Sequence, residues 1–336
     1  MHTCREDNPG LPAPVLQMMV DSMHRQDYAG DFELIIVDLL WERRRKQFYE
    51  ILASLEPPKS GVKIPVLYIP DKSSPFKDRS ILRIATPKNT GLLFARGTHV
   101  IFTDDCQVIP ENALSLLSEW AEQGYGATMC YEKRVWGGVG GTDRTTGVDR
   151  RGEVLGIQVG TGKVVTARDI GFLGGTMSMV PIESLEAVNG WDEMFDGSRQ
   201  LEDGDMIIRL AGHNQLMAYE NRARIIEYEC GNYGKEVNPQ PIKCNGAYAQ
   251  YVWGLGRRQA NKLSGEQLAE AIQRSAWVNC LRVRPGDQCY PHMSPCTKLG
   301  TKEELEAIYN DPRILFDIAE LRCQRSWRYA VEIATR

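Results

Sequence analysis

A short apolar run that ends on two adjacent acids constrains this chain more than any other feature. Residues 88–97 have the glycine spacing and apolar periodicity of a short helix, and the run 99–103 that follows stops at Asp104 and Asp105. A helix followed by a buried strand is typical of an α/β sheet, in which ligands bind at the carboxyl ends of the strands. Adjacent carboxylates repel each other unless a cation offsets their charge, and divalent ions such as Mg²⁺ prefer oxygen ligands. We therefore predict a metal-bound phosphate site here. A plain surface turn is the alternative, because Asp is common in turns.

A second acidic segment lies further along the chain. Residues 189–193 read N-G-W-D-E, and Glu202, Asp203 and Asp205 open a segment that runs to Arg209. Taken alone, this segment fits the acidic first turn of a helix, with Asp205 and Arg209 as an i,i+4 ion pair. Two acidic segments in one α/β chain favour a common site over two unrelated turns.

The order of these motifs resembles the nucleotide-sugar glycosyltransferases of the GT-A fold, and most closely the inverting family 2. The resemblance covers about residues 3–230. It includes an N-x-G-x-x-x-A-R-G-like segment, the acids at 104–105, the pair Gly174-Gly175, the N-G-W-D-E turn and an E-D-x-D-x-x-x-R segment at 202–209. Its strength is the order and spacing of several weak motifs. The resemblance implies a Rossmann-like, mostly parallel central sheet and transfer of a sugar from a nucleoside diphosphate, with UDP as the expected nucleotide.

The resemblance also implies roles for the residues of the second segment. Asp203 would be the general base that deprotonates the acceptor hydroxyl, with Glu202 beside it as a second catalytic carboxylate. Crowding of like charges raises the pKa of a carboxyl, whereas a helix N-terminus lowers it. Trp191 and Asp192 would shape the acceptor pocket.

Further residues are implied to bind the metal and the donor. Asp105 would bind Mn²⁺ or Mg²⁺ directly and Asp104 would lie nearer the ribose, with Glu227 or Glu229 in place of the family's late His ligand. The usual motif is D-x-D, and Thr103 occupies the position of an acid. The family's first strand is reduced here to a stub, which either suffices or lacks a few residues. The donor would be bound by Thr3, Arg5, Asp38, Lys88, Asn89, Arg96, Asp104 and Gly175.

Helical and strand-like segments alternate along the first part of the chain. Helices are predicted at 15–26, 42–55, 89–96 and 111–123, and strands at 32–37, 65–69, 99–103 and 125–131. This alternation predicts a mostly parallel, doubly wound sheet. The glycine-rich residues 135–165 lack a dinucleotide fingerprint and predict a hairpin or mobile loop over the active site, with a surface insertion as the alternative.

The pattern becomes helical beyond residue 240, and we expect a glycosyltransferase domain at 1–235 and an α-helical appendage at 236–336 that could bind the acceptor. Capping boxes begin at Ser264 and Thr301. Residues 231–336 hold 15 Lys or Arg against 11 Asp or Glu. This basic appendage suits either a saccharide acceptor or, as in viral DNA glycosylation, a hydroxymethylated base in DNA. The candidate phosphate contacts are Arg257, Arg258, Arg322, Arg325 and Arg328.

Cysteine usage and composition set the remaining expectations. Cys280, Cys289, His292 and Cys296 have the residue types of a structural zinc site, but no C-x-x-C knuckle is present, which favours free thiols. The chain has 336 residues, 42% hydrophobic and 25% charged, with no apolar run long enough for a membrane span. We expect a cytoplasmic enzyme. A sugar nucleotidyltransferase would need a G-x-G-T-R-like turn, which is missing, and an inactive binding module would have lost acids that are present here.

Overall fold

The computed structural model describes residues 1–71 except Cys4 and Asn8, 82–166, 173, 175, 177–188, 190–196 and 202–229. The expected appendage at 236–336 lies outside the described residues. The candidate zinc ligands Cys280, Cys289, His292 and Cys296 and the arginines proposed for DNA phosphates therefore also lie outside them.

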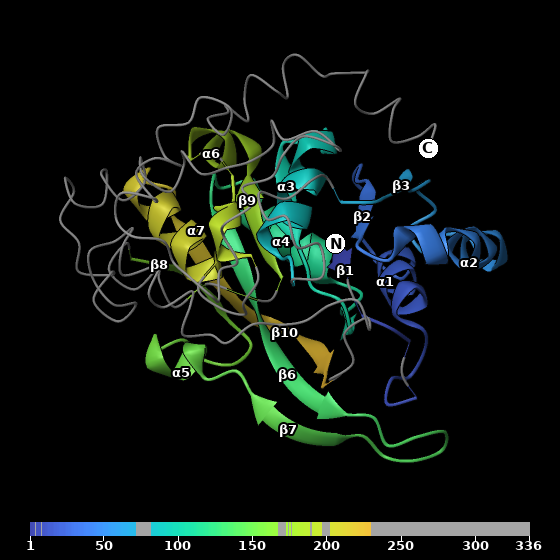
Figure 1. Cartoon of the computed structure of the whole chain (residues 1–336). Helices are drawn as coiled ribbons and strands as arrows, with labels where there is room; N and C mark the ends of the chain where they lie inside the picture. Colours follow the sequence, from blue (N-terminus) through green and yellow to red (C-terminus); the bar gives the residue numbers. More distant parts are fainter. Residues whose placement is uncertain are drawn as a thin grey trace, which may run out of the picture.

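A three-stranded parallel sheet begins the chain. Its strands β1 (His2–Thr3), β2 (Leu34–Asp38) and β3 (Val66–Ile69) lie in the order β1-β2-β3, with Thr3 opposite Asp38. Two helices, α1 (Val15–His24) and α2 (Trp41–Ser54), accompany these strands at the blue end of Figure 1. Helix α1 forms because apolar residues recur at helical spacing, and it buries its face of Val15, Met18, Met19 and Met23 in the core.

A larger, mixed sheet follows. It has the order β4-β9-β6-β10-β5, from strands β4 (His99–Phe102), β5 (Gln107–Val108), β6 (Gly126–Val135), β9 (Ser178–Pro181) and β10 (Met217–Tyr228). Within this sheet β6 and β10 pair in parallel, whereas β4 with β9, β9 with β6 and β10 with β5 are antiparallel. The α/β class is confirmed, but the prediction of a mostly parallel sheet is wrong for this part. The sheet is mixed because β9 runs opposite to both of its neighbours, β4 and β6, and β5 runs opposite to β10.

The glycine-rich residues form paired structure. Strand β7 (Arg144–Val148) makes an antiparallel hairpin with β6, and after the short helix α5 (Arg151–Val154) strand β8 (Gly162–Val165) pairs with β10. Figure 1 shows this hairpin extending from the end of the large sheet. The predicted hairpin is therefore present.

Helix α3 (Ala85–Phe94) begins four residues before the predicted start at Asn89. The carboxylate of Asp196 accepts hydrogen bonds from the backbone N–H groups of Ile84 and Ala85, each at 2.7 Å, and of Thr86 at 3.1 Å. These groups are unpaired in an isolated first turn, so the cap comes from a residue far along the chain. Local sequence does not show such a cap.

The remaining helices complete the core. Helix α4 (Ala113–Ala121) packs on β6 and β10, while α6 (Ile182–Ala187), a 3₁₀ turn (Glu193–Phe195) and α7 (Glu202–Gly212) lie near α3. A cavity of about 450 Å³ is lined by residues of β1, β2, α3, β4 and α4, Lys88 among them. Within the described residues, no helix has the length and apolarity of a membrane span.

Candidate functional site

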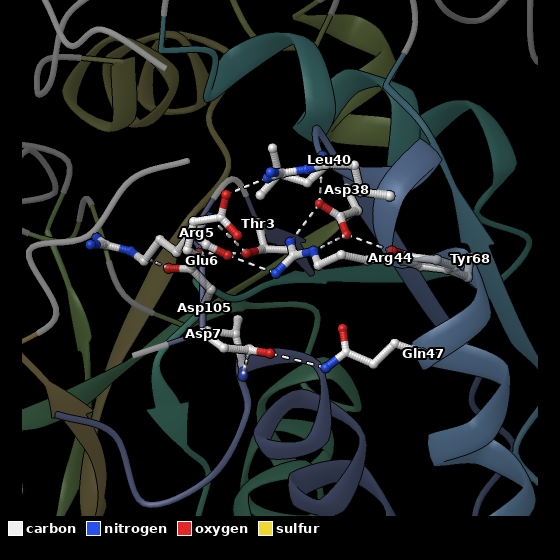
Figure 2. Close-up of polar contacts among 12 residues, drawn as sticks. Thr3, Arg5, Glu6, Asp7, Asp38, Leu40, Arg44, Gln47, Tyr68 and Asp105 are labelled. Atoms are coloured by element: carbon white, nitrogen blue, oxygen red, sulfur yellow. Dashed lines mark hydrogen bonds and ion pairs between the residues drawn. The ribbon is translucent and has the colours of Figure 1, made fainter. Parts of the chain in front are cut away.

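A saturated polar network surrounds Asp38 at the carboxyl end of β2 (Figure 2). Asp38 is fully buried and accepts hydrogen bonds from Arg44 Nε at 2.9 Å, Arg44 Nη2 at 2.6 Å, the Tyr68 hydroxyl at 2.5 Å and the Leu40 N–H at 2.8 Å. Burial lowers the pKa of Arg44, but the charge of Asp38 more than offsets this and raises it. The expected donor contact of Asp38 does not fit, because its oxygens are buried and already satisfied.

The same network includes Asp105. The Thr3 hydroxyl donates to Asp105 Oδ2 and Arg5 Nε donates to Asp105 Oδ1, both at 2.8 Å, and Arg44 Nη1 donates to the Arg5 carbonyl at 2.6 Å (Figure 2). Thr3 and Asp105 are buried, and 22% of the Arg5 side chain is exposed. Asp105 therefore links β1 to the end of β4, and of these three residues Arg5 is the most open to a donor.

In a second cluster, the three carboxyl groups of Asp104, Glu202 and Asp203 act on a single cation, Lys88. Lys88 Nζ lies 2.9 Å from Asp203 Oδ1 and 3.9 Å from the ring centroid of Trp191. The Lys88 side chain is 5% exposed and that of Asp203 23%, whereas that of Asp104 is 41% exposed. We call the group formed by Lys88, Asp104, Glu202 and Asp203, whose charges act on one another, the acidic recess.

Burial and repulsion shift the titration of the acidic recess. The surrounding chain partly desolvates the Asp104 carboxyl and so raises its pKa above the ordinary value, although the charge of Lys88 acts in the opposite direction. Burial, together with the neighbouring charge of Asp203, raises the pKa of Glu202 to about 8. Burial also lowers the pKa of His2, whose Nε2 lies 3.8 Å from Asp104, so His2 is neutral and this contact is not an ion pair. Carboxyls perturbed in this way are typical of functional sites.

Asn89, Trp191 and Asp192 were expected to contact the substrates, but their side chains are buried beside the recess. Asn89 is fully buried, and its side chain bonds the backbone N–H and carbonyl of Trp191 and the carboxylate of Glu193, all at 2.8 Å. Trp191 is 4% exposed and packs edge to face on Phe102, and Asp192 is 2% exposed. The donor role of Asn89 and the acceptor roles of Trp191 and Asp192 do not fit side chains that are enclosed in this way.

Helix α7 is fixed by a buried ion pair that the sequence spacing predicts. Arg209 Nε lies 2.8 Å from Asp205 Oδ2, and Arg209 Nη1 donates to the carbonyls of Val188 and Gly190. Both side chains are almost completely buried. The pair therefore ties the backbone at Val188 and Gly190 to α7, the helix that carries Asp203.

Gly175 lies directly against Asp203. Its φ of +83° belongs to the left-handed region, and a Cβ at this position would lie 3.3 Å from Asp203 Oδ2. Only glycine adopts this conformation at little cost. Gly175 therefore leaves room for the Asp203 carboxylate, and its expected contact with the donor stays a prediction.

The structure does not bring Arg96 to the recess. Arg96 follows the carboxyl end of α3 and pairs with Glu33, with Arg96 Nη2 2.7 Å from Glu33 Oε2. Glu33 precedes β2, whereas Asp38 ends it, so the two lie at opposite ends of a strand. The donor role expected for Arg96 does not fit this position.

The acids present fit a divalent ion only in part. Within the described residues, no group of three His, Cys, Asp or Glu side chains is arranged to hold a metal. Asp105 is turned toward Thr3 and Arg5, Glu227 lies 3.6 Å from Lys133, and the Glu229 N–H donates to the Arg134 carbonyl. Asp104 has the open carboxylate, which reverses the order expected for the two acids. One carboxylate suits Mg²⁺ or Mn²⁺ when substrate phosphates supply other ligands.

Several residues that build the site escaped the sequence analysis. Arg44 and Tyr68 enclose Asp38, and Asp196 caps α3. Thr103 stands where the D-x-D motif has its first acid, and its hydroxyl donates a hydrogen bond to Gln107 Oε1 at 2.8 Å. The position of Arg44, a basic residue on the helix directly after β2, could have indicated a partner for Asp38. For Asp196, the contact spans more than a hundred residues and no local signal exists.

Comparison with known proteins identifies the fold. No protein-family model matches the sequence, and no curated protein matches it. Among solved structures, S. aureus TarS 1–349 in complex with UDP-GlcNAc superposes with a TM-score of 0.50 and 14% identity, over 78% of this chain and 66% of that one. TarS 1–349 in complex with UDP superposes with a TM-score of 0.47 and 12% identity, over 78% of this chain and 65% of that one. GalNAc-T7 with UDP, GalNAc and Mn²⁺ superposes with a TM-score of 0.46 and 11% identity, over 95% of this chain and 56% of that one. The chain thus spans slightly less than two thirds of the TarS fragment, and it has the GT-A glycosyltransferase fold.

Proposed function

We propose that this protein is an inverting glycosyltransferase that moves a sugar from a nucleoside diphosphate, UDP being the expected nucleotide, to an acceptor hydroxyl. The observation that carries the proposal is the acidic recess, where Lys88 from α3, Asp104 from the end of β4 and Asp203 from the start of α7 converge. TarS, which shares the fold, is described with UDP-GlcNAc bound.

The leaving diphosphate carries charge that the recess is suited to offset. Asp104, with its exposed carboxylate, would hold Mg²⁺ or Mn²⁺, and such an ion neutralises the developing charge on the diphosphate when it is bound. Lys88 adds a fixed positive charge beside the same space. Arg5 is partly exposed next to Asp105 and completes the basic side of the donor site.

Asp203 is the residue best placed to act as the base. Its carboxylate is 23% exposed, it lies in the first turn of the buried helix α7, and Gly175 leaves room for its Oδ2. In the proposed step the acceptor hydroxyl gives its proton to Asp203 while its oxygen attacks the anomeric carbon. Because the attack comes from the face opposite the diphosphate, the bond to the diphosphate breaks with its electron pair on the leaving oxygen and the anomeric configuration is inverted.

The direct test is a donor screen. The full chain is incubated with UDP-, GDP-, dTDP- and CMP-linked sugars and Mn²⁺, and the released nucleotide is measured. We expect slow hydrolysis of one donor that stops in EDTA and is lost in Asp104→Asn. Lys59→Met, on a remote exposed ion pair with Glu111, is the control that should keep activity. Absence of turnover with every donor, with and without acceptors, would reject the proposal.

The acceptor is tested in the same assay. Saccharides in one arm and hydroxymethylated duplex DNA in the other should be compared for stimulation of nucleotide release. We expect one arm to raise the rate above hydrolysis, because a bound acceptor replaces water as the nucleophile. Stimulation by DNA would identify the acceptor as a nucleic acid. Stimulation by a saccharide alone would exclude DNA as the acceptor.

A further inference from the structure

We propose that Lys88 exchanges its partner during the reaction, leaving Asp203 for the donor diphosphate, so that donor binding releases the base. This inference rests on the proposed function and concerns the coupling between its two substrates. Lys88 is here a positioning residue, since it acts on the acceptor through Asp203.

The surroundings of Lys88 fix the helix that carries it and leave its charged end near several acids. Asn89 and the Asp196 cap hold α3 in place, and the Lys88 ammonium rests 3.9 Å above the Trp191 ring. Its nitrogen donates to Asp203 at 2.9 Å. Burial lowers the pKa of Lys88, but the charges of Asp203, Asp104 and Glu202 together raise it above its ordinary value. Lys88 therefore stays charged and is attracted to more than one carboxylate.

The contact with Asp203 has a cost for catalysis. The Lys88 ammonium occupies Asp203 Oδ1 with a charge-assisted hydrogen bond, so this oxygen is not open to the proton of an acceptor hydroxyl. The structure thus holds the base in a resting arrangement.

A diphosphate is a stronger partner for Lys88 than a single carboxylate. It carries more charge over several oxygens, and a lysine ammonium is a compact charge on a flexible stem that rotates between neighbouring acceptors. When the diphosphate enters beside Asp104, Lys88 turns to it, and Asp203 is left to accept the proton of the acceptor hydroxyl. The donor should therefore bind before the acceptor.

The exchange predicts an energetic coupling that binding alone can measure. UDP affinity, in the presence of Mg²⁺, is determined by calorimetry for the wild type, Lys88→Met, Asp203→Asn and the double variant. If Asp203 competes with UDP for Lys88, Asp203→Asn tightens UDP binding by about fivefold or more. In the Lys88→Met background the same substitution should give a clearly smaller gain, because only the repulsion between Asp203 and UDP is then relieved.

The controls separate this inference from the proposed function. Lys59→Met tests whether loss of any positive charge weakens UDP binding, and it should not. Lys88→Arg should keep part of the coupling because it retains the charge. Thermal denaturation checks that each variant folds. Failure of the wild type to bind UDP or the other nucleoside diphosphates would reject the proposed function. Binding by the wild type with the same effect of Asp203→Asn in both backgrounds would reject only the exchange.

Discussion

Two groups of charged residues lie close together in this molecule and differ in how completely their charges are paired. Around Asp38, the two carboxylate oxygens receive donors from Arg44, Tyr68 and the Leu40 backbone, and all are buried. In the acidic recess, the carboxylates of Asp104, Glu202 and Asp203 all act on Lys88. Among the described residues, Glu202 Oε2 has no hydrogen-bond partner.

The difference separates structural acids from reactive ones. A buried carboxylate with every lone pair satisfied has no capacity left for a substrate, and its removal leaves an unpaired cation. Carboxylates that share one cation keep unsatisfied charge, which a ligand with positive or proton-donating groups relieves. Resemblance to a family motif placed both Asp38 and Asp203 at the substrates, as donor contact and as base, whereas their hydrogen bonds separate a structural acid from a reactive one.

The largest expected effect comes from breaking the saturated group. Asp38→Ala leaves Arg44 buried without its partner, and we expect the free energy of unfolding to fall by about 3 to 5 kcal/mol. Urea denaturation followed by circular dichroism measures this. The double variant Asp38→Ala/Arg44→Met should recover part of the loss, since neither charge is then buried alone. A single variant as stable as the wild type would show that this network does not support the fold.

The next effect concerns the recess and is kinetic. Asp203→Asn keeps the shape of the side chain but cannot accept a proton, so kcat should fall by about 10²-fold or more, or about 2.7 kcal/mol in activation free energy. The unfolding midpoint should change little, because Asp203 is partly exposed. Steady-state kinetics with the donor identified in the screen measures this. A rate near that of the wild type would move the base elsewhere, with Glu202 as the next residue to test.

A smaller effect is the pH dependence of stability that Glu202 introduces. The pKa of Glu202 rises from 4.5 to about 8 on folding, because burial and Asp203 disfavour its charged form. The folded chain therefore holds this proton more tightly than the unfolded chain, and stability falls as pH rises through this window. Glu202→Gln removes the contribution, so its stability relative to the wild type should increase between pH 5 and pH 8, by at most about 1.4 kcal/mol per pH unit.

The control for Glu202 is an exposed glutamate elsewhere. Glu50→Gln changes a side chain that is 67% exposed on α2, and its stability should follow the wild type across the same pH range. Unfolding titrations at several pH values compare the variants. A constant difference between Glu202→Gln and the wild type from pH 5 to pH 8 would contradict the raised pKa.

Sequence alone predicted the order of elements and the segments that meet at the site. Strands β2, β3 and β4 and helices α1 to α4 lie within a few residues of their predicted ranges, because apolar periodicity is a local property. Lys88, Asp104, Glu202 and Asp203 were named before the structure placed them together. What the motifs share with a family is therefore enough to locate this recess.

The roles of individual residues were predicted less well because they depend on contacts between distant segments. Thr3, Asp38 and Asn89 lie in the expected segments, yet their side chains bond to Asp105, Arg44 and the Trp191 backbone. The start of α3 depends on the cap from Asp196. The mixed sheet depends on the antiparallel pairing of β9 with β4 and β6 and of β5 with β10. Pairing of this kind is set by tertiary packing, which overrides local propensity.

The smallest expected effect tests the residue that the structure removes from the site. Arg96 is exposed and pairs with Glu33 at the opposite end of β2 from Asp38. Exposed ion pairs contribute little to stability, because solvent screens the charges and both side chains lose conformational freedom when they pair. Arg96→Met should therefore leave the urea midpoint unresolved from that of the wild type, and UDP affinity by calorimetry should be unchanged. Lys88→Met, which removes the same charge from the same helix region but inside the recess, is the matched comparison and should weaken UDP binding. Weakened binding in Arg96→Met would restore the donor role that the sequence motif suggests, and it would place the nucleotide at the opposite end of β2 from Asp38.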